Sequence, residues 1–289
     1  MGVNIQTIKD IRFYLTKELA EIYQEQEINA LTNIIIKTVA GITRLHQLYN
    51  SEQVVNREQA AKIIEICKEL KKGKPVQYIL GETTFYDCLI KVNSATLIPR
   101  PETEELVHLI INENKGYHGE IIDFGTGSGC IAVALAANLP GSIVTGIDIS
   151  DDAISIAREN AHLNNVNISF EKADIFDFDS KTVNKAGIIV SNPPYVRNSE
   201  KQLMNKNVLD FEPHMALFVN DSEPLVFYKA ILGIADKILV PGGRLYFEIN
   251  EAMGATMVKL LGAFAYSDIQ IVADINNKDR IIKGTKYAG

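Results

Sequence analysis

Long hydrophobic runs are absent from this sequence, and cysteine and histidine are scarce. No stretch reaches the about 18 uncharged apolar residues of a transmembrane helix, so we expect no membrane span. Residues 1–10 carry no basic-then-apolar export signal, which favours a cytoplasmic protein. The three cysteines lack metal-ligand spacing and predict reduced core thiols rather than a disulfide framework. The five histidines are scattered, so no metal site is expected.

Basic charge is also limited. The chain has 289 residues and a net charge of −7. Residues 1–75 contain 11 basic and 9 acidic residues, whereas residues 76–289 contain 18 basic and 27 acidic ones. A protein that grips duplex DNA neutralises several phosphates with a basic surface. The acidic balance of the larger part therefore disfavours nucleic acid as a direct partner.

Three segments with different hydrophobic patterns follow one another along the chain. Residues 1–72 are expected to form a helical domain, because apolar residues recur at helical spacing. The first apolar stripe consists of Ile8, Ile11, Leu15, Leu19 and Ile22. Residues 73–100 predict a linker with a β-hairpin, extended from about residue 76. Residues 101–289 alternate short apolar strands with helices and predict a separate domain.

The alternating part predicts an α/β fold. Short apolar strands are expected at 121–124, 143–147, 168–170, 188–190 and 245–249. Apolar strands separated by helices imply a parallel, Rossmann-like sheet that is covered on both faces. Two further strands near the end are joined by a polar turn and predict a closing antiparallel hairpin. The sheet would then have about seven strands.

A glycine-rich loop follows the first of these strands. Its residues are Gly125, Thr126, Gly127, Ser128 and Gly129, called the glycine loop below. Glycines allow tight turns and a close approach to a ligand, and the N–H groups of the next helix favour an anionic group. Asp148, about 20 residues further on at the end of a strand, is placed to accept hydrogen bonds from ribose hydroxyls. Together they predict an adenosine-containing cofactor, and a nicotinamide dinucleotide fits this spacing as well.

Asp174 follows the third strand, directly before Ile175 and Phe176. Its carboxylate is expected to accept a hydrogen bond from the adenine amino group, while the two apolar residues cover the ring. The alternative is a solvated loop acid.

The segment after the fourth strand decides the reaction class. It reads Asn192, Pro193, Pro194 and Tyr195, called the Asn-Pro-Pro-Tyr segment below. The prolines lock the backbone and remove N–H donors, so nearby carbonyls are free to accept hydrogen bonds. Two acceptors, the Asn192 side-chain oxygen and the Pro193 carbonyl, match the two N–H donors of a planar –NH2 group, and Tyr195 offers a flat surface for stacking. We therefore expect Asn192, Pro193 and Tyr195 to be catalytic, positioning such a nitrogen for attack on a sulfonium methyl.

These two motifs resemble the methyltransferases that act on planar –NH2 nitrogens. Residues 73–81 and 97–107 are moreover similar to the release factor glutamine methyltransferases, and Pro-Arg-Pro-Glu-Thr-Glu is close to a signature of that family. The resemblance covers roughly residues 73–282. It implies a class I S-adenosyl-L-methionine-dependent methyltransferase fold, with residues 101–289 as its catalytic domain. The expected reaction is methylation of the side-chain amide of a glutamine, in the Gly-Gly-Gln loop of peptide chain release factors.

The family's functional positions carry over residue by residue. The resemblance places cofactor contacts at Gly125, Thr126, Gly127, Ser128, Gly129, Asp148, Ile175 and Asn192. It places substrate amide contacts at Asn192, Pro193, Pro194 and Tyr195, with Phe85 as a further aromatic wall. Ile175 departs from the pattern, because an aromatic residue is common there. Residues 1–72 suit the family's N-terminal domain and are expected to dock the release factor, with no direct nucleic acid or membrane partner.

Two other classes of protein also fit part of the sequence. A DNA adenine-N6 methyltransferase applies the same segment to an exocyclic amine, but it has to flip out its base and hold the duplex. A nicotinamide-binding oxidoreductase, or a non-catalytic module that binds an adenosine cofactor, explains the glycine loop and leaves the Asn-Pro-Pro-Tyr segment without a task.

Overall fold

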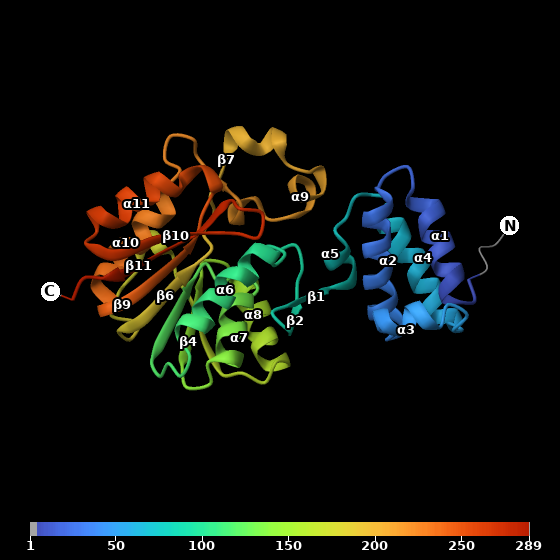
Figure 1. Ribbon diagram of the computed structural model, residues 1–289, viewed down its shortest axis with the longest axis horizontal. Coiled ribbons are helices and arrows are strands. Elements are labelled where there is room, and N and C mark those ends of the chain that lie inside the picture. The colour runs from blue at the N-terminus through green and yellow to red at the C-terminus, as the bar shows by residue number, and fades with distance from the viewer. Residues whose placement is uncertain (1–4, 289) are drawn as a thin grey trace. The chain divides into compact units, whose positions relative to one another are not determined.

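The computed structural model describes residues 5–288, which divide into two compact units (Figure 1). The first unit comprises the described residues up to Gly81 together with Lys206–Phe211. The second comprises Glu82–Asn205 and the described residues from Glu212 onward. The first unit therefore continues past residue 72, and Val76 is part of its core.

The first unit is built from helices, with one isolated antiparallel bridge between Thr7 and Val54. Its helices are α1 (Ile8–Leu19), α2 (Glu25–Ala40), α3 (Arg44–Tyr49), α4 (Arg57–Leu70), α5 (Val76–Leu80) and α9 (Lys206–Phe211). The predicted stripe is buried in its core at Ile8, Ile11, Leu15 and Leu19. Ile22 is 47% exposed, because α1 ends before it and the helical spacing no longer applies.

The extended structure predicted from residue 76 is wrong over α5. Pro75 sets the backbone just before the first turn of this helix, a position where its missing N–H donor costs nothing. Gly81 ends the helix in the left-handed conformation with φ +79°, as glycine commonly does. The predicted hairpin is confirmed directly after it, as β1 (Glu82–Phe85) paired with β2 (Cys88–Lys91).

A seven-stranded sheet forms the centre of the second unit, as predicted. Its strands are β3 (Glu120–Phe124), β4 (Ile143–Asp148), β5 (Ile168–Lys172), β6 (Ala186–Ser191), β9 (Leu239–Glu248), β10 (Tyr266–Ala273) and β11 (Asp279–Lys286). Their order is β10-β11-β9-β6-β3-β4-β5. The strands from β9 to β5 are parallel, and β11 pairs antiparallel with both of its neighbours. This arrangement is the class I methyltransferase fold.

Helices cover both faces of this sheet (Figure 1). They are α6 (Pro101–Glu113), α7 (Cys130–Asn138), α8 (Asp151–Leu163), α10 (Val226–Ile238) and α11 (Gly254–Ala263). Helices α10 and α11 pack on one face, where they bury Phe124 and Phe247. Because side chains alternate along a strand, the neighbours Asp123 and Glu248 belong to the opposite face. None of the helices described between residues 5 and 288 is both long and apolar enough to cross a membrane.

Short elements complete the second unit. They are β7 (Val196–Arg197), β8 (Phe218–Val219), and the 3-10 helices η1 (Ile175–Asp177), η2 (Asn198–Leu203), η3 (His214–Ala216) and η4 (Glu251–Met253). The strand order reverses between β3 and β6, since β4 and β5 lie on one side of β3 and β6 lies on the other. Loops diverge at such a point and leave a crevice at the carboxyl ends of the strands. The glycine loop and the Asn-Pro-Pro-Tyr segment therefore border the same crevice.

Gly129 should be irreplaceable for the fold at the start of α7. Its φ is +76°, and a Cβ there would lie 2.9 Å from the Cβ of Ala157 on α8. We expect Gly129→Ala to lower the free energy of unfolding by about 2–4 kcal/mol, from left-handed strain plus overpacking. Urea unfolding checks this. Gly262→Ala on α11 is the matched control, because its Cβ would meet no described atom within 4 Å, and it should keep or raise stability. Equal stability of the two variants would contradict the argument.

Candidate active site

A cavity of about 610 Å³ opens at the carboxyl edge of the sheet in the second unit. This volume lies within the range of small-molecule sites. Predicted residues that line the cavity are Gly125, Thr126, Gly127, Ser128, Asp148, Asp174, Ile175, Asn192 and Pro194. The loops after β3, β4, β5 and β6 all contribute, so four separate stretches of sequence meet in one site.

The glycine loop is held by Asp148. The Gly127 N–H donates to Asp148 Oδ2 at 2.8 Å, and the Ser150 N–H donates to Oδ1 at 3.0 Å. Each carboxylate oxygen keeps a further lone pair, so Asp148 can still accept from the two hydroxyls of a ribose. Gly125 and Gly127 have φ of +69° and +55°, which explains glycine at both positions without any steric crowding.

Beneath the loop lies a buried carboxylate for which no role was predicted. Asp123 is fully buried on β3, and its Oδ2 accepts from the Thr126 hydroxyl at 2.6 Å. Its Oδ1 has no hydrogen-bond partner within residues 5–288. Burial raises the pKa of Asp123 to about 7, although the bond from Thr126 opposes this shift. Thr126 is therefore held by two bonds: its backbone N–H donates to the Ile147 carbonyl, and its hydroxyl donates to Asp123.

An apolar wall forms beside Asp174. Its Oδ1 accepts from the Phe176 N–H at 2.9 Å and caps η1, which places Ile175 against the cavity. The Phe176 ring is 56% exposed and stands 5.3 Å from the ring of Phe227. Phe227 also lines the cavity and was not predicted, because it lies on α10, about 50 residues away in sequence. Phe227 and Ile231 add apolar surface on the side where Ile175 replaces an aromatic residue.

Asn192 is held by a chain of hydrogen bonds. Its Nδ2 donates to Thr103 Oγ1 at 3.2 Å, and the Thr103 hydroxyl donates to Glu248 Oε2 at 2.6 Å. The Tyr195 hydroxyl donates to the other oxygen, Glu248 Oε1, at 2.9 Å. Burial raises the pKa of Glu248, and the bonds from Thr103 and Tyr195 and the charge of Arg280 lower it. The sequence singled out neither Thr103 nor Glu248 as a site residue.

Four predicted residues do not line the cavity. They are Gly129, Pro193, Tyr195 and Phe85. Tyr195 packs partly against the hydrophobic core and donates its hydroxyl to Glu248, so it anchors the Asn-Pro-Pro-Tyr segment to the core. Phe85 is only 1% exposed, within the β1–β2 hairpin. Pro193 is buried as well. The contact of Gly129 with the cofactor, and of the other three with the substrate, stays a prediction.

An ion pair shapes the mouth of the cavity. Arg100 Nη2 donates to Glu212 Oε1 at 2.7 Å, and the Ile98 N–H donates to Glu212 Oε2 at 3.2 Å. The Glu212 side chain is 1% exposed, so this pair is far better shielded from solvent than a surface salt bridge. The pair ties Glu212 to the segment around Arg100, and it thereby positions the residues after Glu212, of which Pro213 and Met215 line the cavity.

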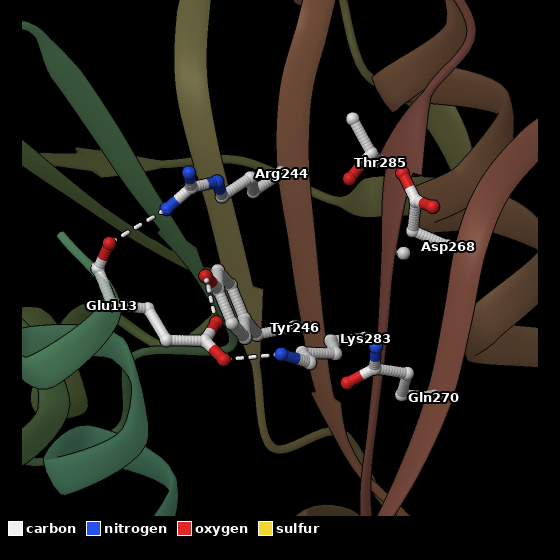
Figure 2. Close-up of a pocket in the computed structure, with 8 residues that line it drawn as sticks. Glu113, Arg244, Tyr246, Asp268, Gln270, Lys283 and Thr285 are labelled. Atoms are coloured by element: carbon white, nitrogen blue, oxygen red, sulfur yellow. Dashed lines mark hydrogen bonds and ion pairs between the residues drawn. The ribbon is translucent and has the colours of Figure 1, made fainter.

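A second, smaller hollow of about 290 Å³ lies on β9, β10 and β11 (Figure 2). Glu113 at the end of α6 binds three groups there. Its carboxylate pairs with Lys283 and accepts from the Tyr246 hydroxyl at 2.9 Å, while its carbonyl accepts from Arg244 at 2.8 Å. The carboxylate of Glu113 neutralises Lys283, and the three contacts together fasten α6 to the sheet. No group of three or more His, Cys, Asp or Glu side chains within residues 5–288 could hold a metal ion.

Comparisons with known proteins point to one family. A Methyltransferase small domain matches residues 103–210, and a PrmC N-terminal domain matches residues 11–81. The chain is 43% identical over 280 residues to a release factor glutamine methyltransferase of Flavobacterium psychrophilum, covering 96% of this chain and 98% of that protein. It is 40% identical over 276 residues to one of Bacteroides thetaiotaomicron, covering 96% and 99%. A methyltransferase structure from Pyrococcus furiosus shares the fold, with a TM-score of 0.51, 17% identity, and 80% and 100% of the two chains covered.

Asp123 should make stability depend on pH. Its pKa of about 7 in the folded protein exceeds its ordinary value of 3.8, so the folded state retains a proton that the unfolded state loses. The stability contributed by that proton is complete below about pH 4 and is lost as the pH rises through 7. We expect the free energy of unfolding of Asp123→Asn to exceed that of the wild type at pH 8 by on the order of 1–4 kcal/mol, and to match it near pH 4, as measured by urea unfolding. Asp236→Asn, on the exposed side of α10, serves as the control. A difference between Asp123→Asn and wild type that is the same at both pH values would refute the assignment.

Proposed function

This chain belongs to the release factor glutamine methyltransferase family, and we propose that its Asn-Pro-Pro-Tyr segment holds the glutamine side chain that is methylated. As a member of that family, the protein is an S-adenosyl-L-methionine-dependent enzyme that methylates the side-chain amide nitrogen of a glutamine in peptide chain release factors. The observation that supports the proposed role of the segment is the position of Asn192. It lines the cavity that the glycine loop and Asp148 also line, and its Nδ2 is already bonded to Thr103.

The residues of the cavity fit S-adenosyl-L-methionine. The Asp148 carboxylate suits a ribose, Asp174 with Ile175 suits an adenine ring, and the glycine loop exposes backbone to the remainder. When bound, the cofactor supplies an electrophilic methyl group on a positively charged sulfur. The cavity walls combine carboxylates with apolar side chains, and this donor set suits a ligand that is part cation and part planar ring. We assign cofactor contacts to the lining residues of the glycine loop and to Asp148, Asp174 and Ile175.

The chemistry that remains for the protein is to orient a weak nucleophile. An amide nitrogen has a delocalised lone pair, so it attacks only when it is held in line with the methyl group. The Oδ1 of Asn192 and the carbonyl of Pro193 can each accept one N–H of the glutamine amide. Both acceptors gain strength as positive charge develops on the nitrogen during attack. Pro194, which lines the cavity, excludes water beside them.

The same two acceptors would also fit the exocyclic amine of adenine, so we weigh DNA as a second candidate substrate. The balance of 18 basic and 27 acidic residues in 76–289 opposes a phosphate-binding surface. The family membership favours protein over nucleic acid. We propose that the enzyme binds its release factor directly and does not bind nucleic acid.

We further propose that the first unit docks the release factor. Residues 11–81 match the PrmC N-terminal domain, while every residue that lines the cavity belongs to the second unit. Helix α3 presents Leu45, Leu48 and Tyr49 with exposed fractions of 62%, 70% and 84%, together called the α3 face. Large apolar side chains gathered on one short helix are typical of a contact surface. A folded protein substrate needs such a surface outside the catalytic cavity, since stable interfaces bury about 1,200–2,000 Å².

Replacing Asn192 tests the catalytic proposal. Asn192→Ala removes an acceptor that faces developing charge, and such losses typically cost about 2.7–4 kcal/mol in the transition state. We expect its turnover of a purified release factor to fall by about 100- to 1,000-fold, with S-adenosyl-L-methionine affinity by calorimetry much less affected. Asn184→Ala, an exposed asparagine bonded to Glu120, is the control and should retain activity.

The product of the wild-type reaction decides the substrate class. Mass spectrometry should find one added methyl group on a glutamine of the release factor, and purified DNA should remain unmodified under the same conditions. Methylated adenine would contradict a glutamine side chain as the substrate. Wild-type turnover by Asn192→Ala would contradict the proposed role of the Asn-Pro-Pro-Tyr segment.

The α3 face is tested by the double variant Leu48→Ser, Tyr49→Ser. We expect KM for an intact release factor to rise about tenfold, the equivalent of about 1.4 kcal/mol of lost contact, with kcat nearly unchanged. A short peptide that carries the same glutamine should react equally well with both enzymes, because it does not need the docking surface. Ile143→Thr, 58% exposed at the amino end of β4, removes an apolar group elsewhere and should leave KM unaltered. An unchanged KM in the double variant would exclude the α3 face as the docking surface.

A further inference from the structure

The Asn-Pro-Pro-Tyr segment is tied at both ends to one buried carboxylate. Glu248 Oε1 accepts from the Tyr195 hydroxyl at 2.9 Å, and Oε2 accepts at 2.6 Å from Thr103, which in turn bonds Asn192. Strand β9 lies beside β6 with Phe247 opposite Ser191, so Glu248 emerges next to Asn192. Glu248 is 1% exposed and Thr103 is 2% exposed. The Thr103–Glu248 bond is thus shielded from water, where hydrogen bonds are strong and their direction matters.

The chemistry of these groups allows one direction for the chain of bonds. The hydroxyl donors Thr103 and Tyr195 and the charge of Arg280 stabilise the ionised form of Glu248 against the effect of burial. An ionised carboxylate accepts hydrogen bonds and cannot donate them. The single proton of the Thr103 hydroxyl is therefore committed to Glu248, which leaves that oxygen with lone pairs only. A lone pair can bond the Nδ2 of Asn192 and repels its Oδ1. Asn192 is consequently fixed with its NH2 group toward Thr103 and its Oδ1 away from it.

This orientation is the one that the proposed reaction needs. A glutamine –NH2 group offers only donors, so it can be held by the Oδ1 of Asn192 and not by its Nδ2. An asparagine amide looks nearly the same in both orientations, and nothing in its shape would prevent it from turning over. With its NH2 group toward the substrate, Asn192 would present donors to donors.

We propose that Thr103 is a positioning residue for methyl transfer, and that Glu248 sets the direction in which Thr103 holds the Asn192 amide. This inference rests on the proposed role of Asn192. It assigns a task to the threonine of the Pro-Arg-Pro-Glu-Thr-Glu stretch, which starts helix α6, and to a carboxylate on β9 that lies 145 residues further along the chain.

The test compares Thr103→Val with Thr103→Ser in the full-length enzyme, using an intact release factor as substrate. Valine keeps the size of threonine and removes the hydroxyl, whereas serine keeps the hydroxyl. We expect kcat of Thr103→Val to fall by about 10- to 100-fold. Losses of this size are typical when a residue that orients a functional side chain through a hydrogen bond is removed, as is known for the residues that orient metal ligands. KM for the release factor and the dissociation constant of S-adenosyl-L-methionine should change little. Thr103→Ser should recover most of kcat.

The matched control is Thr145→Val. Thr145 lies on β4 of the same sheet with 9% exposure, and it is not part of the chain of bonds between Asn192, Thr103 and Glu248. It should retain wild-type kcat. Glu248→Gln gives an independent measurement should Thr103→Val not fold. Its Nε2 replaces one acceptor by a donor, so either Thr103 or Tyr195 loses its acceptor, and kcat should again fall.

The outcomes separate this inference from the function on which it rests. Wild-type enzyme that fails to methylate the release factor would overturn the proposed function. Wild-type activity combined with an unimpaired Thr103→Val would overturn the positioning role alone. Equal impairment of Thr103→Ser and Thr103→Val would show that a hydroxyl at this position does not restore kcat, and it would overturn the positioning role of the Thr103 hydroxyl. Wild-type kcat in Glu248→Gln would remove Glu248 from the chain.

Discussion

Strands β3 and β6 lie side by side and parallel, with the order of the sheet reversing between them, and the active site depends on this constraint. Parallel strands end at the same edge, so the glycine loop after β3 and the Asn-Pro-Pro-Tyr segment after β6 emerge next to each other. The first loop suits the cofactor and the second suits the amide. Their distance is therefore set by the spacing of two hydrogen-bonded strands, which flexible side chains could not maintain.

Buried carboxylates hold both loops in place. Asp123 lies under the glycine loop and binds Thr126, while Glu248 lies under the Asn-Pro-Pro-Tyr segment and binds Thr103 and Tyr195. Burying such groups is unfavourable, and the raised pKa values of both acids express this cost. Short hydroxyl bonds offset part of it. The two buried acids therefore lower the stability of the core, and in return they orient the polar side chains that border the cavity.

The two units differ in what they contribute. The second unit contains every residue that lines the cavity, and the Arg100–Glu212 pair joins its segments around the mouth. The first unit has its own core, built on α1, α2 and α4, and carries exposed apolar residues on α3. In the proposed division, the second unit provides the catalytic cavity and the first unit provides a contact surface for the protein substrate.

The sequence by itself determined the order of strands and helices, the glycine loop, Asp148 and Asn192, because each depends on residues that are close together along the chain. It failed over Val76–Leu80, where a short apolar run carries too few residues to separate a helix from a strand. Only the tertiary structure decided the partners of those motifs. Thr103 meets Glu248 across 145 residues and Arg100 meets Glu212 across 112, and no local pattern encodes contacts of that separation. It likewise placed Tyr195 and Phe85 outside the cavity lining, since burial depends on which elements pack above a side chain.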